Sequence, residues 1–112
     1  MSTIETLPTL TGSEKQIAWA ATIRRDALAL LAACETEELA SRAEWERDGG
    51  ESETLRALRD QKFARIAEAR TRIAAATAAA AIIDARLVLG GIKSYLNSGL
   101  PRRFCAALPL PV

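Results

Sequence analysis

The chain has 112 residues, enough for one domain with a modest core, and its 15 Lys and Arg nearly balance its 14 Asp and Glu. It contains no histidine, which removes the commonest general base and metal ligand, and Cys34 and Cys105 lie too far apart for a zinc or redox motif. We therefore expect no cofactor and no metal ion, and a reduced cytosolic setting is favoured over a disulfide. Because Asp84 and Arg86 interrupt the most apolar stretch, residues 73–92, we also expect no membrane span.

Signals for the start of a long helix follow a short N-terminal arm. We expect residues 1–11 to be flexible and residues 12–48 to form the first helical region. Two pairs of residues spaced three apart stand at its start: Thr11 with Glu14, and Ser13 with Gln16. Either pair suits a capping box, in which the two side chains satisfy free backbone N–H groups reciprocally. The sequence leaves open which pair forms it.

One face of this region is apolar at helical spacing. Its members are Ile17, Ala20, Ile23, Ala27, Leu30, Leu31 and Cys34. Trp19 lies beside this face, and we expect it to anchor the core, the usual role of a large aromatic side chain in an alanine-rich chain. Thr36 precedes two glutamates and suits a fresh helix start, so the pattern allows either a continuous helix or a kink near residues 34–37.

Gly49 and Gly50 form the strongest internal turn signal, and we place the turn of a helical hairpin there. The second helix is expected to span residues 52–89, with Gly90 in the left-handed position that follows a helix. Its predicted seam has the three-and-four spacing of a coiled coil: Leu55, Arg59, Lys62, Ile66, Ala69, Ile73, Ala76, Ala80, Ile83 and Leu87. Because two basic residues interrupt the first turns of this seam, tight packing should begin near Ile66.

The last segment, residues 92–112, is expected to hold a short helix over residues 92–96, ended by Gly99 and Pro101, and then a tail that packs as an extended strap or stays loose. The predicted fold class is therefore all-α. One domain over residues 1–112 forms an antiparallel hairpin of two long helices, followed by a short C-terminal helix and an extended tail. Because two long helices leave much of each apolar stripe uncovered, we expect either a homodimer or a partner protein.

The near-neutral total conceals a strong charge asymmetry. Residues 1–53 hold 11 acids and 5 bases, a net charge of −6, whereas residues 54–112 hold 3 acids and 10 bases, a net charge of +7. The simpler interpretation is intramolecular, because two antiparallel helices of opposite charge attract each other. The alternative is that one of the two charged surfaces docks a charged partner.

Five acidic residues ahead of the turn form the candidate partner-binding surface: Glu37, Glu38, Glu44, Glu46 and Asp48. Three of them, Glu37, Glu44 and Asp48, share one side of a helix at spacings of seven and four residues. We expect this side to be exposed and to differ from the apolar face of the same helix. Exposed carboxylates suit a partner whose own surface is basic because it binds DNA.

No catalytic site can be assembled from this sequence. There is no histidine to activate a serine or cysteine, and neither glycine pair is followed by the Lys-Ser or Lys-Thr of a phosphate loop. We therefore expect that the chain is not an enzyme. Asp84 and Arg86 suit a structural pair near the end of the second helix. The stretch Arg102, Arg103 and Phe104 suits either a phosphate or carboxylate site or a solvated tail.

Two blocks of the sequence resemble motifs of small helical proteins from phages, plasmids and other bacterial mobile elements. Residues 10–24, LTGSEKQIAWAATIR, are similar to the pattern GSEKQxxWAxxI, and residues 82–86, IIDAR, are similar to a later motif of the form IIDNR or WIDNR. The two blocks cover about 20 of the 112 residues. Ala85 stands where the motif has Asn, which removes the polar contact of that side chain. The family that these blocks resemble includes an anti-CRISPR protein that acts on type I systems.

The resemblance implies a shared scaffold in which the two blocks pack together. The residues that carry it are Ser13, Gln16, Trp19, Asp84 and Arg86. In that arrangement Lys15 or Gln16 should reach Asp84.

The resemblance also implies a function, a phage- or mobile-element-encoded inhibitor of bacterial defence in the cytoplasm of the bacterial host. Such an anti-CRISPR would bind a protein subunit of a type I CRISPR effector complex stoichiometrically. One alternative is a nucleic-acid-binding helical protein that uses the basic half, which is less expected because its basic residues lie at several angles around the helix. The other alternative is a dimeric structural adaptor of a mobile element.

Overall fold

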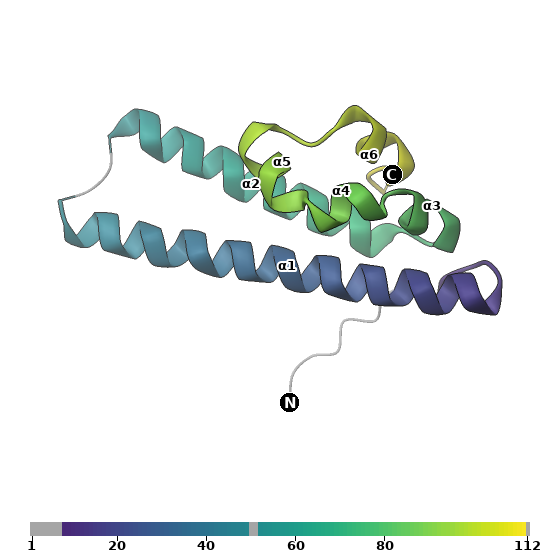
Figure 1. Ribbon diagram of the computed structural model, residues 1–112. Helices are drawn as coiled ribbons and strands as arrows, with labels where there is room; N and C mark the ends of the chain where they lie inside the picture. The colour runs from purple at the N-terminus through teal and green to yellow at the C-terminus, as the bar shows by residue number, and fades with distance from the viewer. Residues whose placement is uncertain (1–7, 50–51, 112) are drawn as a thin grey trace.

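The computed structural model describes residues 8–49 and 52–111, and within them the fold is all-α. The helices are α1 (Glu14–Arg47), α2 (Glu53–Ala75), α3 (Ala79–Asp84), α4 (Arg86–Gly90), α5 (Ile92–Ser98) and α6 (Arg102–Ala107). Figure 1 shows α1 and α2 running antiparallel as a hairpin, with the four short helices beside them at the end away from the turn. The predicted hairpin of two long helices is confirmed. Most of the predicted arm, residues 1–7, lies outside the described residues.

The start of α1 shows which of the two predicted capping boxes forms. The Ser13 side chain accepts a hydrogen bond from the Gln16 N–H (3.2 Å), and the Gln16 side chain accepts one from the Ser13 N–H (3.1 Å). From there α1 continues unbroken, because the Thr36 hydroxyl donates to the Ala32 carbonyl (3.0 Å) within the helix instead of capping a new one. Gly49, with φ of +110°, begins the turn where the sequence predicts it.

The prediction of a second helix over residues 52–89 is wrong, because α2 ends before Ala76, which is extended (φ −66°, ψ 132°). The Thr11 N–H donates to the Thr77 carbonyl (2.7 Å), and the Ala79 N–H donates to the Thr11 carbonyl (2.9 Å), so that a short parallel bridge replaces one turn of helix. The alanine run that contains this break has no large side chains to hold a helical register by packing. Backbone pairing with the distant Thr11 therefore prevails over local helix propensity.

The break changes which residues beyond it face the core. The predicted seam residue Leu87 is 82% exposed, and Ala80 is also exposed. The buried side chains of this region are instead Ala79, Ile82, Ala85, Val88, Leu89 and Ile92. Gly90 lies inside α4 and not in the predicted left-handed position, while Gly99, with φ of +114°, ends α5.

The core lies at the end of the hairpin away from the turn. Its long-helix members are Ala20, Ala27, Leu31 and Cys34 of α1 and Ile66, Ala69 and Ile73 of α2. Packing begins at Ile66, as the seam predicts. Among the described residues of 35–49 and 52–65, which we call the hairpin arm, none is fully buried. The arm therefore projects from the core as two antiparallel helices (Figure 1), and the end of α5 contacts it at Arg65.

The chain after α4 is held against α2 by two arginines. Arg65 donates to the carbonyls of Leu96 (3.1 Å) and Asn97 (3.0 Å) at the end of α5. Seven residues later, Arg72 donates to the carbonyls of Cys105 (3.1 Å) and Leu108 (3.0 Å) at the end of α6. The predicted short helix is present as α5, but α6 replaces the first part of the predicted tail. Both cysteines are free thiols.

Candidate protein-binding surface

The two motif blocks meet where α1 passes the junction of α3 and α4. The Arg86 guanidinium lies 5.3 Å from the centre of the Trp19 ring and also donates to the Ile83 carbonyl (2.8 Å). Trp19 is 51% exposed, so its predicted role as a core anchor is wrong. The reason is local: the neighbouring Ala20 takes the position that faces the core, and the indole lies at the rim beneath a cation.

The predicted contact from Lys15 or Gln16 to Asp84 is wrong as well. Among residues 8–49 and 52–111 no hydrogen bond or ion pair joins these side chains, since the Gln16 amide is used in the capping box and Asp84 is exposed. The stacking of Arg86 on Trp19 is the contact that joins the blocks. The two blocks therefore contact each other through Trp19 and Arg86, and not through the predicted contact to Asp84.

A groove runs between α1 and α4 next to this contact. It encloses about 220 Å³ and is lined by Ile23, Asp26, Ala27, Leu30, Arg86, Leu89 and Gly90. Most of these side chains are apolar, and one carboxylate and one guanidinium supply its polar groups. Such a groove has the composition of a surface that receives apolar side chains and fixes their orientation with a few charges.

The acidic residues continue the side of α1 that lines this groove. Seven residues make nearly two full helical turns, so the successive heptad positions Ile23, Leu30, Glu37 and Glu44 share one side of the unbroken α1, and Asp48 follows four residues later. The expectation that the acidic side differs from the apolar face is therefore wrong for Ile23 and Leu30. We call these five residues the α1 strip. It is apolar in its first half and acidic in its second.

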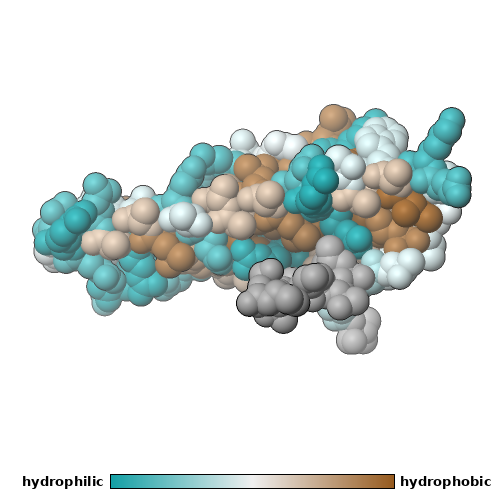
Figure 2. All heavy atoms as spheres, turned by 90° about the horizontal axis from the view of Figure 1, so that it is seen from below, coloured by the Kyte–Doolittle hydropathy of each residue, from teal (hydrophilic) through white to brown (hydrophobic). Residues whose placement is uncertain are grey.

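The view from below shows the same change along the molecule (Figure 2). Apolar atoms gather in separate patches over the middle and right of this face, and hydrophilic side chains cover most of the hairpin end at the left. A partner that lies along α1 would therefore meet both kinds of surface.

The acidic residues of the α1 strip differ in their intramolecular partners. Glu37 forms an ion pair with Lys93 (3.2 Å), and both side chains are well exposed. Glu44 and Asp48 are exposed and form no ion pair within the described part of the chain. Outside the strip, Glu46 pairs with Arg42 (3.4 Å) at the surface of the same helix. Exposed pairs of this kind contribute little to stability, so these carboxylates remain open to a partner.

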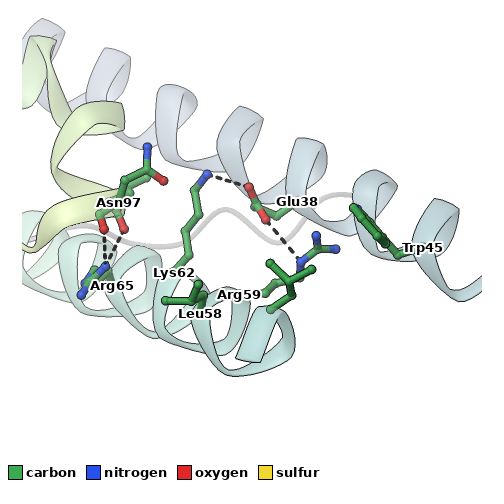
Figure 3. A pocket seen from close by; sticks show the side chains of 9 residues that line it. Glu38, Trp45, Leu58, Arg59, Lys62, Arg65 and Asn97 are labelled. Atoms are coloured by element: carbon green, nitrogen blue, oxygen red, sulfur yellow. Dashed lines mark hydrogen bonds and ion pairs between the residues drawn. The ribbon is translucent and has the colours of Figure 1, made fainter. Parts of the chain in front are cut away.

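Glu38 is placed differently from the other four acidic candidates. Its side chain is only 17% exposed, and it lies between the helices of the hairpin, 2.6 Å from Lys62 and 3.7 Å from Arg59. Figure 3 shows both basic side chains of α2 directed toward it. These contacts fit the intramolecular interpretation of the charge asymmetry, and a second such pair joins Glu35 to Arg70 (3.4 Å).

Sequence reasoning missed a cleft in the hairpin arm. It encloses about 280 Å³ between α1, α2 and the end of α5 (Figure 3). Its lining residues are Glu38, Trp45, Leu55, Leu58, Arg59, Lys62, Arg65, Leu96 and Asn97. The two basic residues in the predicted seam were the signal that could have revealed it, because charged side chains between helices hold them apart. In the C-terminal stretch, Arg102 and Arg103 are exposed but Phe104 is buried, so that aromatic ring is not available to a ligand.

Comparison with known proteins adds no relative. No family model matches the chain, and no curated protein and no solved structure is similar to it. Within residues 8–49 and 52–111, no helix has the length and apolar character that crossing a membrane requires. The same residues contain no group of three or more acidic or cysteine side chains placed to hold a metal ion.

Proposed function

We propose that this chain is a non-catalytic inhibitor of bacterial defence, encoded by a phage or another mobile element. Its target is a protein subunit of a type I CRISPR effector complex in the cytoplasm of the host, and it acts as an anti-CRISPR by occupying that subunit stoichiometrically. The resemblance of residues 10–24 and 82–86 to motifs of mobile-element proteins supports this class. The packing of Arg86 on Trp19 supports reading the two blocks as one scaffold.

The α1 strip is the observation that carries the proposal. Its apolar half lines the groove between α1 and α4, and its acidic half presents exposed carboxylates at Glu37, Glu44 and Asp48. The subunits of an interference complex that hold DNA are basic, because the phosphates must be neutralised. Carboxylates opposite those basic side chains speed encounter and select the partner, while apolar contacts in the groove supply affinity.

The basic half of the chain is less suited to the alternative of nucleic-acid binding. Arg59 and Lys62 are paired with Glu38, and Arg70 with Glu35. Arg65 and Arg72 are used to hold the ends of α5 and α6. Phosphate contacts would have to compete with these internal contacts.

The test measures binding to purified type I interference complexes and the plating of a phage on a host that carries the system. The triple variant Glu37→Lys, Glu44→Lys, Asp48→Lys should bind at least about tenfold more weakly than the parent, since each reversal turns attraction into repulsion. A charge-matched control reverses three exposed acids elsewhere, Glu14, Glu53 and Asp60. That control should bind like the parent, and the parent's affinity should fall as salt is added.

Three results would refute the proposal. They are no binding by the parent to any type I complex tested, equal weakening by the two triple variants, and a salt-sensitive gel shift of duplex DNA by the chain alone at the same concentrations. The last result would favour the nucleic-acid-binding alternative.

A further inference from the structure

The cleft of the hairpin arm lies where a third layer of helix stops. Near the core, α5 packs against both α1 and α2. Leu96 and Asn97, in the last turn of α5, line one end of the cleft, and Gly99 then turns the chain away. Beyond that point the two long helices continue with nothing described over them (Figure 1). Near the core, α1, α2 and α5 thus form a three-helix arrangement, and the cleft lies where a third helix would continue beyond the end of α5.

Large apolar side chains from both long helices form the walls of the cleft. Leu58 is 55% exposed, and Trp45 and Leu55 are close to half exposed. These are three of the seven large hydrophobic side chains that are exposed in the described chain, and a fourth, Leu39, lies on the same arm outside the cleft lining. Exposed apolar side chains gathered around one cleft are typical of a surface that receives a partner.

The charges at the inner end of the cleft specify what kind of partner fits. Three cations, Arg59, Lys62 and Arg65, line it together with one carboxylate, Glu38. Arg59 and Lys62 share that carboxylate, and Arg65 is bonded to neutral carbonyls. Lys62 is balanced by Glu38, whereas Arg65 has no carboxylate partner among the described residues, so an acidic group of a partner would neutralise the positive charge of Arg65.

We propose that the cleft docks an amphipathic helix of a partner protein, with its apolar residues on Trp45, Leu55 and Leu58 and a Glu or Asp at the cationic end. Helices enter grooves of this kind with residues spaced three and four apart. The site is separate from the α1 strip, and its charge preference is the opposite. It therefore does not depend on the proposed function.

Two synthetic helices test the proposal directly. The acidic probe has the sequence ELAELLAELAELLA, and the basic probe replaces each Glu by Lys, so the apolar face is the same. Binding is followed by the fluorescence of Trp45 in a Trp19→Phe background, which leaves one indole as the reporter. The acidic helix should bind at least about tenfold more tightly than the basic helix at this indole, and the preference should decrease with salt.

Matched variants assign the binding to the cleft. Leu58→Ser should weaken the acidic helix about tenfold through loss of apolar contact, while Leu87→Ser, which alters a still more exposed leucine on α4, should leave the affinity unchanged. Equal affinity of the two probes, no effect of Leu58→Ser, or no binding of the acidic helix would overturn the proposal. So would a dimer of the parent chain that Leu58→Ser dissociates, because a second copy would then be the occupant. Failure of the type I inhibition test bears on the α1 strip and not on this cleft, so the two proposals can fail separately.

Discussion

Replacing Arg72 by Met is expected to destabilise the fold more than its position near the surface of α2 suggests. The Arg72 side chain is 12% exposed, and its guanidinium donates to the carbonyls of Cys105 and Leu108 while pairing with Glu68 (2.9 Å). Met preserves much of the aliphatic contact, so the measurement isolates the hydrogen bonds.

The expected magnitude follows from these contacts. Each hydrogen bond to a charged group contributes about 1.5–3 kcal/mol when its partner cannot be solvated in its place. The carbonyls of Cys105 and Leu108 lie where α6 meets α2. The Glu68 side chain is more than a third exposed, so water can solvate its carboxylate when Arg72 is absent. Assigning nothing to Glu68, and allowing for partial solvation of the carbonyls, gives a loss of about 3 kcal/mol. For a chain of this size that lowers the Tm by about 12 °C.

The assay is urea denaturation followed by the helical signal, with Arg70→Met as the matched control. Arg70 lies two residues earlier on α2, but its ion pair with Glu35 is exposed by more than a third on both sides, so its loss should cost under about 1 kcal/mol. Arg72→Met should also speed tryptic cleavage after the exposed pair Arg102 and Arg103, since α6 is no longer held. Equal stability of the two variants, or unchanged cleavage, would refute the assignment of Arg72 as the residue that holds α6.

Three further predictions use the same measurement. Glu38→Gln should cost about 2 kcal/mol, because it removes the carboxylate that pairs with the mostly buried side chain of Lys62, and a smaller loss at high salt would confirm the cause. Ser13→Ala should cost about 1 kcal/mol and Ser13→Asp much less, since only Asp keeps an oxygen acceptor for the N–H at the start of α1; equal losses would contradict the capping role. Trp19→Ala should cost under about 2 kcal/mol because the ring is half exposed, whereas Phe104→Ala should cost about 3–5 kcal/mol, and the reverse order would show that the indole is the core anchor after all.

Local signals were sufficient to predict the hairpin. The apolar face that includes Leu31 and the turn at Gly49 depend on residues within a few positions of one another, and both are confirmed. Of the two capping boxes that the sequence allows, the one at Ser13 forms. The start of tight packing at Ile66 follows from the three-and-four spacing of the seam, which basic residues interrupt before that position. Periodicity therefore predicts an element well where neighbouring residues decide its conformation.

Distant partners decide the features that the sequence did not reveal. The end of α2 depends on Thr11, which is 66 positions from Thr77, and no local rule contains that pairing. The contact of Trp19 with Arg86 likewise joins side chains from α1 and α4 that are far apart in the sequence. The basic residues of the predicted seam indicate that the long helices are held apart, but the closed end of the cleft depends on where α5 stops, which is a property of the assembled helices.

The bridge between Thr11 and Thr77 also constrains the order in which the chain folds. Closing a loop of this length costs about 4 kcal/mol in chain entropy, more than two backbone hydrogen bonds return. The hairpin lowers that cost when it forms first, because α2 brings the chain back along α1 toward its starting point. The burial of Leu10 then adds the apolar contribution that makes closure favourable. On the ribosome, where the N-terminal end emerges first, Thr11 must therefore wait unpaired until Ala79 has been synthesised and released from the exit tunnel.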